Sequence, residues 1–461
     1  MNNEIEKEFV VVGAGLTGLT TAYTLTKAGA DVQVLEVQNR VGGQIHTYEE
    51  NGFIFESGPN TGSISWPEVK ELFESLGDSC SLQVADESAK RRLIWKGTQF
   101  WALPSSLSTA LKTPLFTWYD KFRILGEPFR AKGTNPDETV GELACRRLGK
   151  SYVDYAINPF ISGVYAGDPM RLVTRYALPK LYRLENEYGS FIKGSIAKAK
   201  QPKSDRDRKA TKQVFSAQGG LSRLVEALTS AIGMERITLE AQNITIQPLE
   251  DGRWQVQYIG KDGETVAVIA KKVITTVGAY ALPKMLPFVD ESLMSRISNL
   301  EYAPVMQVSV GLKDAQEGDF RAFGALVPQC ENKQILGVLF PSSCFAGRSP
   351  EGGVLMSFFM GGIRHPEMLK KSDEEVREII EHVLVDMLKL RPGTHPDVFH
   401  VFRHEHAIPQ YEKSSGARFE AIEQIESQYP GLVLGGNIRN GIGMADRIRQ
   451  AVTMANEALK G

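Results

Sequence analysis

The stretch Phe9-Val-Val-Val-Gly13-Ala-Gly15-Leu-Thr-Gly18 decides the fold of the N-terminal region. Its apolar start favours a β-strand that runs into a glycine-rich turn. Apolar residues then recur at helical spacing, at Leu16, Leu19, Ala22 and Tyr23. The next strand, over residues 31–35, closes a βαβ unit. The stretch therefore predicts a strand, a tight turn and a helix whose free N–H groups face a phosphate-bearing ligand.

The glycines of this turn have the spacing of a dinucleotide site. Gly13 makes the turn, Gly15 lets the backbone approach a pyrophosphate, and Gly18 lets the helix pack closely on the strand. Glu36, at the tip of the second strand, is placed to accept both ribose hydroxyl hydrogens and to repel a 2′-phosphate. FAD or NAD is thus favoured over NADP, although a lone glycine turn also occurs in ordinary α/β domains. The predicted contacts here are Gly13, Ala14, Gly15, Leu16, Thr17, Gly18 and Glu36.

Composition excludes several classes of protein. The chain has 461 residues, enough for roughly three domain-sized units. A net charge of −2 provides no overall field for nucleic acid, so we expect no such partner. The 4 cysteines show no CxxC spacing, so we expect neither a metal site nor a disulfide framework. Residues 1–8 do not resemble a signal peptide and no run has the roughly 20 apolar residues of a membrane span. We expect a cytoplasmic protein, as a monomer or a homodimer.

A second glycine pair, in Arg40-Val-Gly42-Gly43-Gln44, distinguishes between FAD and NAD. It creates another place where backbone lies against a cofactor, with Arg40 near the phosphates. This stretch resembles the extended fingerprint of the FAD-dependent amine oxidase and protoporphyrinogen oxidase superfamily, which implies FAD. The superfamily places a loop beside the flavin at the spacing of Gly58-Pro59-Asn60. His46 is interpreted as a loop residue and not as a catalytic base. The contacts predicted from this region are Arg40, Gly42, Gly43, Gln44, Gly58, Pro59 and Asn60.

The end of the chain predicts a second strand, glycine loop and helix. Residues 431–437 form the strand, and a helix starts near Gly443. The positive end of that helix can stabilise negative charge on a reduced flavin. The contacts predicted here are Gly436, Gly443, Met444 and Ala445, with Ile244 from the central β region. Both ends of the chain therefore build one cofactor site, and the middle is inserted between them.

The middle of the chain predicts a substrate domain and a helical subdomain. Residues 91–104 read as a hairpin and 105–200 as helices, with one helix starting at Asp137. Strands at 323–328, 335–340 and 353–360 and a helix at 372–390 indicate a second sheet. Residues 198–212 read as a solvated loop, and the stretch from Phe215 as the start of a helix. The fold class is α/β (α+β), a Rossmann-like FAD domain with an inserted mixed-sheet domain. The expected boundaries are 1–85, 214–283 and 428–461 for the FAD domain; 86–106, 199–213 and 284–427 for the substrate domain; and 107–198 for the helical subdomain.

Aromatic and basic residues alternate in the first part of the helical subdomain. The aromatic and apolar members include Trp118, Tyr119, Phe122, Leu125 and Phe129. Such a pattern is typical of a helix that rests on a membrane surface, and it also describes a helix packed on its own protein. Pro114 and Pro128 interrupt any long continuous face, which favours packing in the core.

Three later segments carry a narrower resemblance. Residues 162–169, Ser-Gly-Val-Tyr-Ala-Gly-Asp-Pro, look like a signature of oxygen-dependent protoporphyrinogen oxidases. Residues 407–411 and 136–140 resemble two further landmarks of that family, in family order. The resemblance implies oxidation of protoporphyrinogen IX to protoporphyrin IX in haem biosynthesis, six electrons in three steps, with O₂ reoxidising FAD. Oxidation of coproporphyrinogen III is the first alternative. A flavin amine oxidase, a carotenoid desaturase and a non-enzymatic carrier on the same fold are more distant alternatives.

The same resemblance implies a substrate site but no certain catalytic residue, because flavin N5 accepts the hydride. Arg92 corresponds to an arginine that pairs with a substrate propionate, with an uncertainty of one residue because Arg91 adjoins it. Arg92 also favours protoporphyrinogen IX over coproporphyrinogen III. His404 and His406 are interpreted as structural. The implied substrate contacts are Arg92, Gly163, Phe323, Leu326, Leu339 and Phe359, of which Phe323 and Leu326 are equally compatible with core positions.

Overall fold

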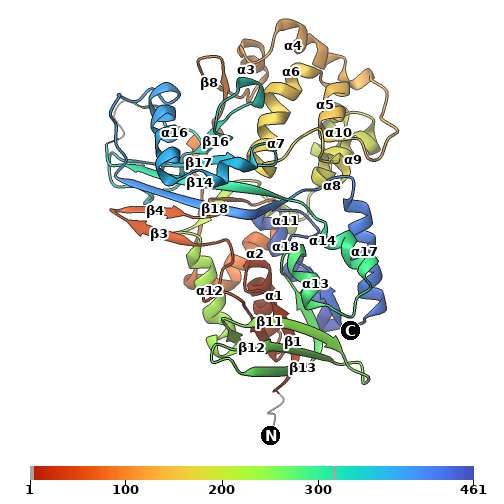
Figure 1. The fold of residues 1–461 in the computed structure, drawn as a ribbon. Helices are drawn as coiled ribbons and strands as arrows, with labels where there is room; N and C mark the ends of the chain where they lie inside the picture. Colours follow the sequence, from red (N-terminus) through yellow and green to blue (C-terminus); the bar gives the residue numbers. More distant parts are fainter. Residues whose placement is uncertain (1–4, 315–317, 461) are drawn as a thin grey trace.

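The computed structural model describes residues 5–314 and 318–460; the first four residues of the polar start lie outside them. Two seven-stranded sheets form the body of the molecule, and a group of helices lies at the end away from the N-terminus (Figure 1). This arrangement confirms the predicted mixed α/β class. Within the described residues, no helix is both long and apolar enough to cross a membrane.

The first sheet has the strand order β10-β2-β1-β13-β12-β11, with β19 also paired to β13. Strands β10, β2, β1, β13 and β19 run parallel, whereas β11 and β12 form an antiparallel extension. Their bounds are β1 Ile5–Val12, β2 Val32–Leu35, β10 Ile237–Thr238, β11 Gln242–Pro248, β12 Trp254–Ile259, β13 Thr265–Thr275 and β19 Leu432–Leu434. The carboxyl ends of β1, β13 and β19 therefore meet at one edge, which is where open parallel sheets bind their ligands.

Helices cover both faces of the first sheet. Because side chains alternate along β1, its residues contribute to the hydrophobic cores on both faces. Val11 points into one core, with α1, α2, α12 and α18, while Val10 and Val12 point into another, with α13, α14 and α17. The helices are α1 Leu16–Lys27, α2 Pro67–Leu76, α12 Ser222–Ile232, α18 Met444–Lys460, α13 Leu282–Met285, α14 Glu291–Ser298 and α17 Ser415–Gln428. Helices from both ends of the chain, α1 and α18, pack together.

The second sheet has the order β18-β14-β17-β16-β15-β7-β8. Its bounds are β7 Arg92–Lys96, β8 Gln99–Ala102, β14 Tyr302–Leu312, β15 Gly324–Leu326, β16 Gly337–Leu339, β17 Val354–Gly361 and β18 Val398–Pro409. The hairpin predicted at 91–104 is β7 and β8, and the helix predicted near 372–390 is α16, Asp373–Asp386. Helix α16 covers one face of this sheet with a continuous apolar core. The other face is turned toward the loops of the first sheet.

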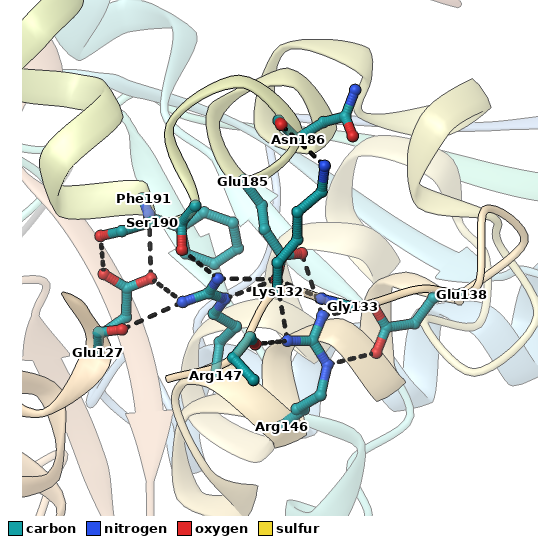
Figure 2. Close-up of polar contacts among 12 residues, drawn as sticks. Glu127, Lys132, Gly133, Glu138, Arg146, Arg147, Glu185, Asn186, Ser190 and Phe191 are labelled. Atoms are coloured by element: carbon teal, nitrogen blue, oxygen red, sulfur yellow. Dashed lines mark hydrogen bonds and ion pairs between the residues drawn. The ribbon is translucent and has the colours of Figure 1, made fainter. Parts of the chain in front are cut away.

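The helical subdomain is held together by buried charges. Arg147 on α5 (Val140–Arg147) lies fully buried between Glu127 and Glu185, and Arg146 pairs with Glu138 and Glu185 (Figure 2). The helix predicted from Asp137 thus begins at Val140, behind a capping box of Thr139 and Glu142. The other α-helices here are α3 Leu107–Lys112, α4 Trp118–Leu125, α6 Lys150–Tyr152, α7 Asn158–Tyr165, α8 Thr174–Ala177, α9 Pro179–Tyr188 and α10 Phe191–Ala199.

Three local predictions differ from the structure. Phe215 lies in strand β9 (Val214–Ala217), between β5 (Gly62–Ser63) and β6 (Leu82–Val84), and α12 begins only at Ser222. The expected solvated loop contains a short helix, α11 (Asp205–Arg208), whose Arg206 pairs with two glutamates of α2. The prediction of core packing is wrong for the large apolar residues of α4 and for Phe129, because Trp118, Tyr119, Phe122 and Leu125 are 60–73% exposed and Phe129 is 87% exposed. It holds for Leu115 and Phe116 of the same stretch, which are buried. Periodicity identified the apolar face but not what covers it.

Candidate functional site

Among the three glycines of the first turn, only Gly15 has open space where a side chain would lie. Gly13 has a φ of +100°, which favours glycine. A Cβ at Gly18 would lie 1.8 Å from the carbonyl oxygen of Gly13, so the helix can approach the strand only without a side chain. A Cβ at Gly15 would meet no atom within 4 Å. Gly15 is also the N-cap of α1, and no side chain caps that helix. An anion can therefore approach the free N–H groups of α1 beside Gly15.

Glu36 lies against this turn. The carboxylate is buried, with Oε2 accepting a hydrogen bond of 2.7 Å from the N–H of Ala14 and Oε1 accepting one of 2.9 Å from the N–H of Gln38. Each oxygen keeps a further lone pair. The segment that leads to Ile244 adjoins this acid, since the N–H of Ala241 donates to the carbonyl of Glu36. Ile244 itself is partly buried at the start of β11. This set fits the ribose end of a dinucleotide.

The second glycine pair folds over the first turn. The N–H of Gly42 donates to the carbonyl of Ala14 at 2.8 Å, and a Cβ at Gly43 would lie 3.2 Å from Cα of Gly15. Both glycines have positive φ. Arg40 donates to the carbonyls of Val41, Gly43 and Ile45. Its guanidinium therefore shapes the loop around the glycine pair, in addition to any contact with phosphates.

The loop 56–60 joins the two sheets. A Cβ at Gly58 would lie 2.1 Å from the carbonyl oxygen of Gln44, so the loop passes directly against the second glycine pair. Pro59 follows, and the Oδ1 of Asn60 accepts a hydrogen bond of 2.8 Å from Ser357 on β17. Gln44 in turn donates to the carbonyl of His406 on β18. The loop after the second glycine pair and the loop 56–60 are thus both hydrogen-bonded to the second sheet.

The histidines near the site have structural partners. Nε2 of His404 lies 2.6 Å from the carbonyl oxygen of Ser57, to which it donates. The ring of His406 lies 4.3 Å from that of Tyr280. Burial, followed by the charge of Arg40, holds the pKa of His46 below its ordinary value. Of the three, His404 forms a hydrogen bond to the backbone, whereas His406 is exposed and His46 is partly buried.

The C-terminal loop completes the same edge. Gly436 follows β19, and its N–H donates to Oε1 of Gln450 at 2.9 Å. The N–H of Gly443 donates to Oδ2 of Asp446 at the start of α18. Met444 and Ala445 are buried in the core that α18 shares with α1. The predicted cofactor residues from both ends of the chain therefore lie along one edge of the first sheet.

Four of the residues predicted to bind the substrate, Arg92, Leu326, Leu339 and Phe359, share one face of the second sheet. The strand pairings place Arg92 beside Gly324, Gly324 beside Leu339, and Gly337 between Phe359 and Leu326. Because directly paired residues point the same way, these side chains form a single face. They are partly or fully exposed, whereas their neighbours Ala325, Val338 and Phe358 are buried under α16. A Cβ at Gly163 on α7 would lie 2.4 Å from Leu326, which brings the signature helix against this face.

Two side chains on this face, absent from the sequence-based set, connect it to the cofactor loop. Gln307 donates to the carbonyl of Glu56 at 2.6 Å, and Ser357 donates to Asn60. Arg348, also missed, pairs with Glu56. Polar residues in otherwise apolar strands were the available signal for Gln307 and Ser357.

The two adjoining arginines have different partners. Arg91 pairs with Asp319 at 2.6 Å. The guanidinium of Arg92 lies 5.4 Å from the ring centroid of Phe323, and no carboxylate of the described residues forms an ion pair with it. Phe323 is half-buried and packs beside Cys344 and Phe345. Arg92 is therefore the cation available on this face.

The glycine loops at the edge of the parallel sheet contact the second sheet, which presents an apolar face. Oxidoreductases that bind a nucleotide cofactor on a Rossmann-like domain commonly have this arrangement. The chain belongs to the flavin containing amine oxidoreductase family, which matches residues 16–459. It is 33% identical to protoporphyrinogen oxidase 1, chloroplastic, of Arabidopsis thaliana, over 98% of this chain and 88% of that protein. It is 24% identical to coproporphyrinogen III oxidase of Bacillus subtilis (strain 168), over 98% of both chains.

A solved structure shows the same fold. The protein from Exiguobacterium sp. 255-15, provisionally named a protoporphyrinogen oxidase, aligns with a TM-score of 0.81 and 23% identity over 99% of each chain. These findings confirm the predicted family resemblance and an oxidoreductase with a flavin cofactor. In the described residues, no cluster of three or more His, Cys, Asp or Glu side chains is suited to a metal ion.

Proposed function

We propose that the protein uses FAD and O₂ to oxidise protoporphyrinogen IX to protoporphyrin IX. The observation that carries this proposal is the apolar face of the second sheet. On this face Arg92 forms no ion pair with a described residue, and Ser357 joins the face to the loop 56–60. A flat macrocycle with a carboxylate side chain matches such a face in shape and in charge. The similarity to plant protoporphyrinogen oxidases over 98% of the chain supports the same substrate.

FAD in particular is supported by the paired glycine loops and Glu36. The open space at Gly15, the free N–H groups of α1 and the lone pairs of Glu36 suit a pyrophosphate and a ribose. The N-terminus of α18 lies at the same edge. We assign the cofactor to the segments 1–85, 214–283 and 428–461, and the substrate to 86–106, 199–213 and 284–427.

The chemistry asks little of the side chains beyond positioning. Bound flavin supplies the hydride acceptor and O₂ restores it. Leu326, Leu339 and Phe359 hold the macrocycle flat and exclude water, while Arg92 orients it through one propionate. The pyrrole N–H groups release their protons as conjugation extends, so no strong base is needed. This agrees with His404 being bound to the carbonyl of Ser57.

Anaerobic mixing tests both the cofactor and the substrate. Purified protein should carry the absorbance of oxidised FAD, and protoporphyrinogen IX should bleach it. Bleaching by coproporphyrinogen III alone would overturn the choice of substrate, which the Bacillus relative makes a specific alternative. A colourless protein that FAD does not reconstitute would instead support a carrier. Benzylamine serves as the control for amine oxidation.

We also propose that the helical subdomain rests on the surface of a membrane. Helix α4, which carries the exposed residues Trp118 and Phe122 together with Lys121, lies at the end of the molecule farthest from the first sheet (Figure 1). The exposed Phe129 and the adjoining Arg130 follow this helix in the sequence. Large exposed aromatic side chains beside cations suit the boundary between lipid headgroups and acyl chains. The substrate of the proposed reaction is apolar, so release and uptake at such a surface would shorten its passage through water.

A further inference from the structure

The loop 436–441 lies against the same sheet edge as the first glycine turn. The N–H of Gly435 donates to the carbonyl of Thr275 at 2.8 Å. A Cβ at Gly436 would lie 2.8 Å from the carbonyl oxygen of Thr276, whose hydroxyl donates to the carbonyl of Gly13 at 3.2 Å. Thr276 therefore connects the two glycine segments. The loop and the start of α18 are parts of the cofactor edge.

A single buried arginine shapes this loop from beneath. Arg447, on the first turn of α18, is 8% exposed. Its Nη2 donates to the carbonyls of Arg439 and Gly441, each at 2.8 Å, and its Nη1 donates to the carbonyl of Gly436. Three loop carbonyls thus converge on one guanidinium. Gln450 links the same groups, because its Oε1 accepts from Arg447 and from the N–H of Gly436.

Among the described residues, Arg447 forms no ion pair, although, besides burial, the charge of the adjacent Asp446 acts on its pKa. Its Nε has no hydrogen-bond acceptor within the same residues. The adjacent Asp446 directs Oδ1 to the indole N–H of Trp66 and Oδ2 to the N–H of Gly443. Burial lowers the pKa of Arg447, yet an arginine remains protonated in proteins. Carbonyl oxygens satisfy the N–H groups without neutralising the charge.

A neighbouring cation on the same loop shows the contrast. Arg439 is neutralised by Glu426, with its Nη1 3.0 Å from Oε2 of that carboxylate. A buried and unpaired charge costs free energy, and such charges gather where function requires them. Here the charge stands at the positive end of a 17-residue helix. The buried charge and the N-terminus of α18 both favour binding of an anion at this edge of the first sheet.

We propose that Arg447 is a positioning residue for the flavin, holding the loop 436–441 in shape and stabilising the negative charge that the flavin gains on reduction. The inference rests on the proposed function in so far as that function places a flavin at this edge. According to this proposal, the negative charge of the reduced flavin is the counter-charge that Arg447 lacks. A side chain with a purely architectural role would set the shape of the loop and leave the reduction equilibrium unchanged.

The test measures the reduction equilibrium of the bound flavin against a reference dye, in the absence of substrate. Arg447→Gln should shift the two-electron equilibrium at least tenfold toward oxidised flavin, which corresponds to about 30 mV. Arg447→Lys keeps the charge and should stay within threefold of the native protein. The matched control is Arg439→Gln, which removes a neutralised cation from the same loop and should also stay within threefold.

Two results would overturn the proposal. One is flavin-loaded Arg447→Gln with the native equilibrium, and the other is Arg447→Lys shifted as far as Arg447→Gln, which would show that hydrogen bonding alone matters. If Arg447→Gln does not fold, Arg447→His replaces it. Its equilibrium should approach the native one in acid and depart from it as the imidazole loses its proton, and absence of that step sinks the idea. A native protein that binds no flavin would instead refute the proposed function.

Discussion

Glu56 and Arg348 meet at 3.0 Å between the two sheets, with each side chain 3% exposed. Glu56 ends β4 (Phe53–Glu56), which pairs with β3 (Thr47–Glu50), and it also accepts hydrogen bonds from Thr47 and from the N–H of Leu221. Burial raises the pKa of Glu56, and the charge of Arg348 opposes that shift. This pair therefore anchors the loop 56–60, which lies between the residues predicted to bind the cofactor and those predicted to bind the substrate.

Arg348→Met should lower the free energy of unfolding by about 3–5 kcal/mol, because it leaves a buried carboxylate without its counter-charge. Urea denaturation at neutral pH measures the change. The exposed pair of Arg91 and Asp319 provides the control, since Arg91→Met should cost about 1 kcal/mol or less. Equal losses in the two variants would contradict the anchoring role.

Two glycines of the first turn should separate binding from folding. Gly15→Ala places a methyl group in open space, so the native melting temperature should persist while FAD affinity falls at least tenfold as the pyrophosphate is kept away. Gly18→Ala sets a Cβ against the carbonyl of Gly13 and should destabilise the fold itself. Thermal unfolding and FAD fluorescence titration measure both quantities. Native FAD affinity in Gly15→Ala would remove the pyrophosphate from this turn.

Arg92→Met should raise KM for protoporphyrinogen IX by about 10- to 100-fold with little change in kcat, because a charge-assisted hydrogen bond contributes about 1.5–3 kcal/mol. Steady-state kinetics supply the numbers. Arg91→Met is the matched control and should stay near the native KM, because Asp319 already holds that guanidinium. If Arg91→Met raises KM and Arg92→Met does not, the propionate contact belongs to the other arginine.

The loop around His46 should lose stability in acid. The pKa of this imidazole is lower in the folded protein than its ordinary value of 6.5, so the unfolded chain binds more protons in the interval between the two. Stability is therefore fully present above about pH 6.5 and falls as the pH drops through the folded pKa. His46→Gln should flatten this part of the profile of unfolding free energy between pH 7.5 and 5. An unchanged slope would show that His46 is already protonated or freely solvated.

Phe122→Ser combined with Phe129→Ser should reduce co-sedimentation with phosphatidylglycerol vesicles at least tenfold, because each buried aromatic side chain contributes about 1.5–3 kcal/mol. The control is Met234→Ser, which removes an exposed apolar side chain (53% exposed) from the end that carries the first sheet. A native protein that does not sediment with these vesicles would contradict the proposal that the helical subdomain rests on a membrane.

Sequence patterns predicted what depends on local geometry. The strand, turn and helix of residues 9–27 and the second glycine pair follow from positive φ and close backbone contacts, which only glycine allows. The apolar runs that form β15, β16 and β17 also made a second sheet predictable. By contrast, Phe215 was assigned to a helix because its pairing with β5 and β6 is non-local.

Other features could not be predicted because they depend on residues distant in sequence. Arg91 and Arg92 differ in role through Asp319, which lies 228 positions beyond Arg91. The buried charge of Arg447 is recognisable only once the loop carbonyls surround it. The exposure of Phe129 could not be predicted either, because a helical apolar face has the same pattern whether lipid, protein or water covers it.

The edge formed by β1, β13 and β19 has a consequence for biosynthesis. The ends of these strands come from residues 12, 275 and 434, so the ribosome delivers the last of them after most of the chain has emerged. The N-terminal turn is therefore synthesised long before the loop after β19, which lies at the same edge of the folded sheet. We therefore expect the edge to bind the proposed flavin only after its last strand, β19, has been synthesised.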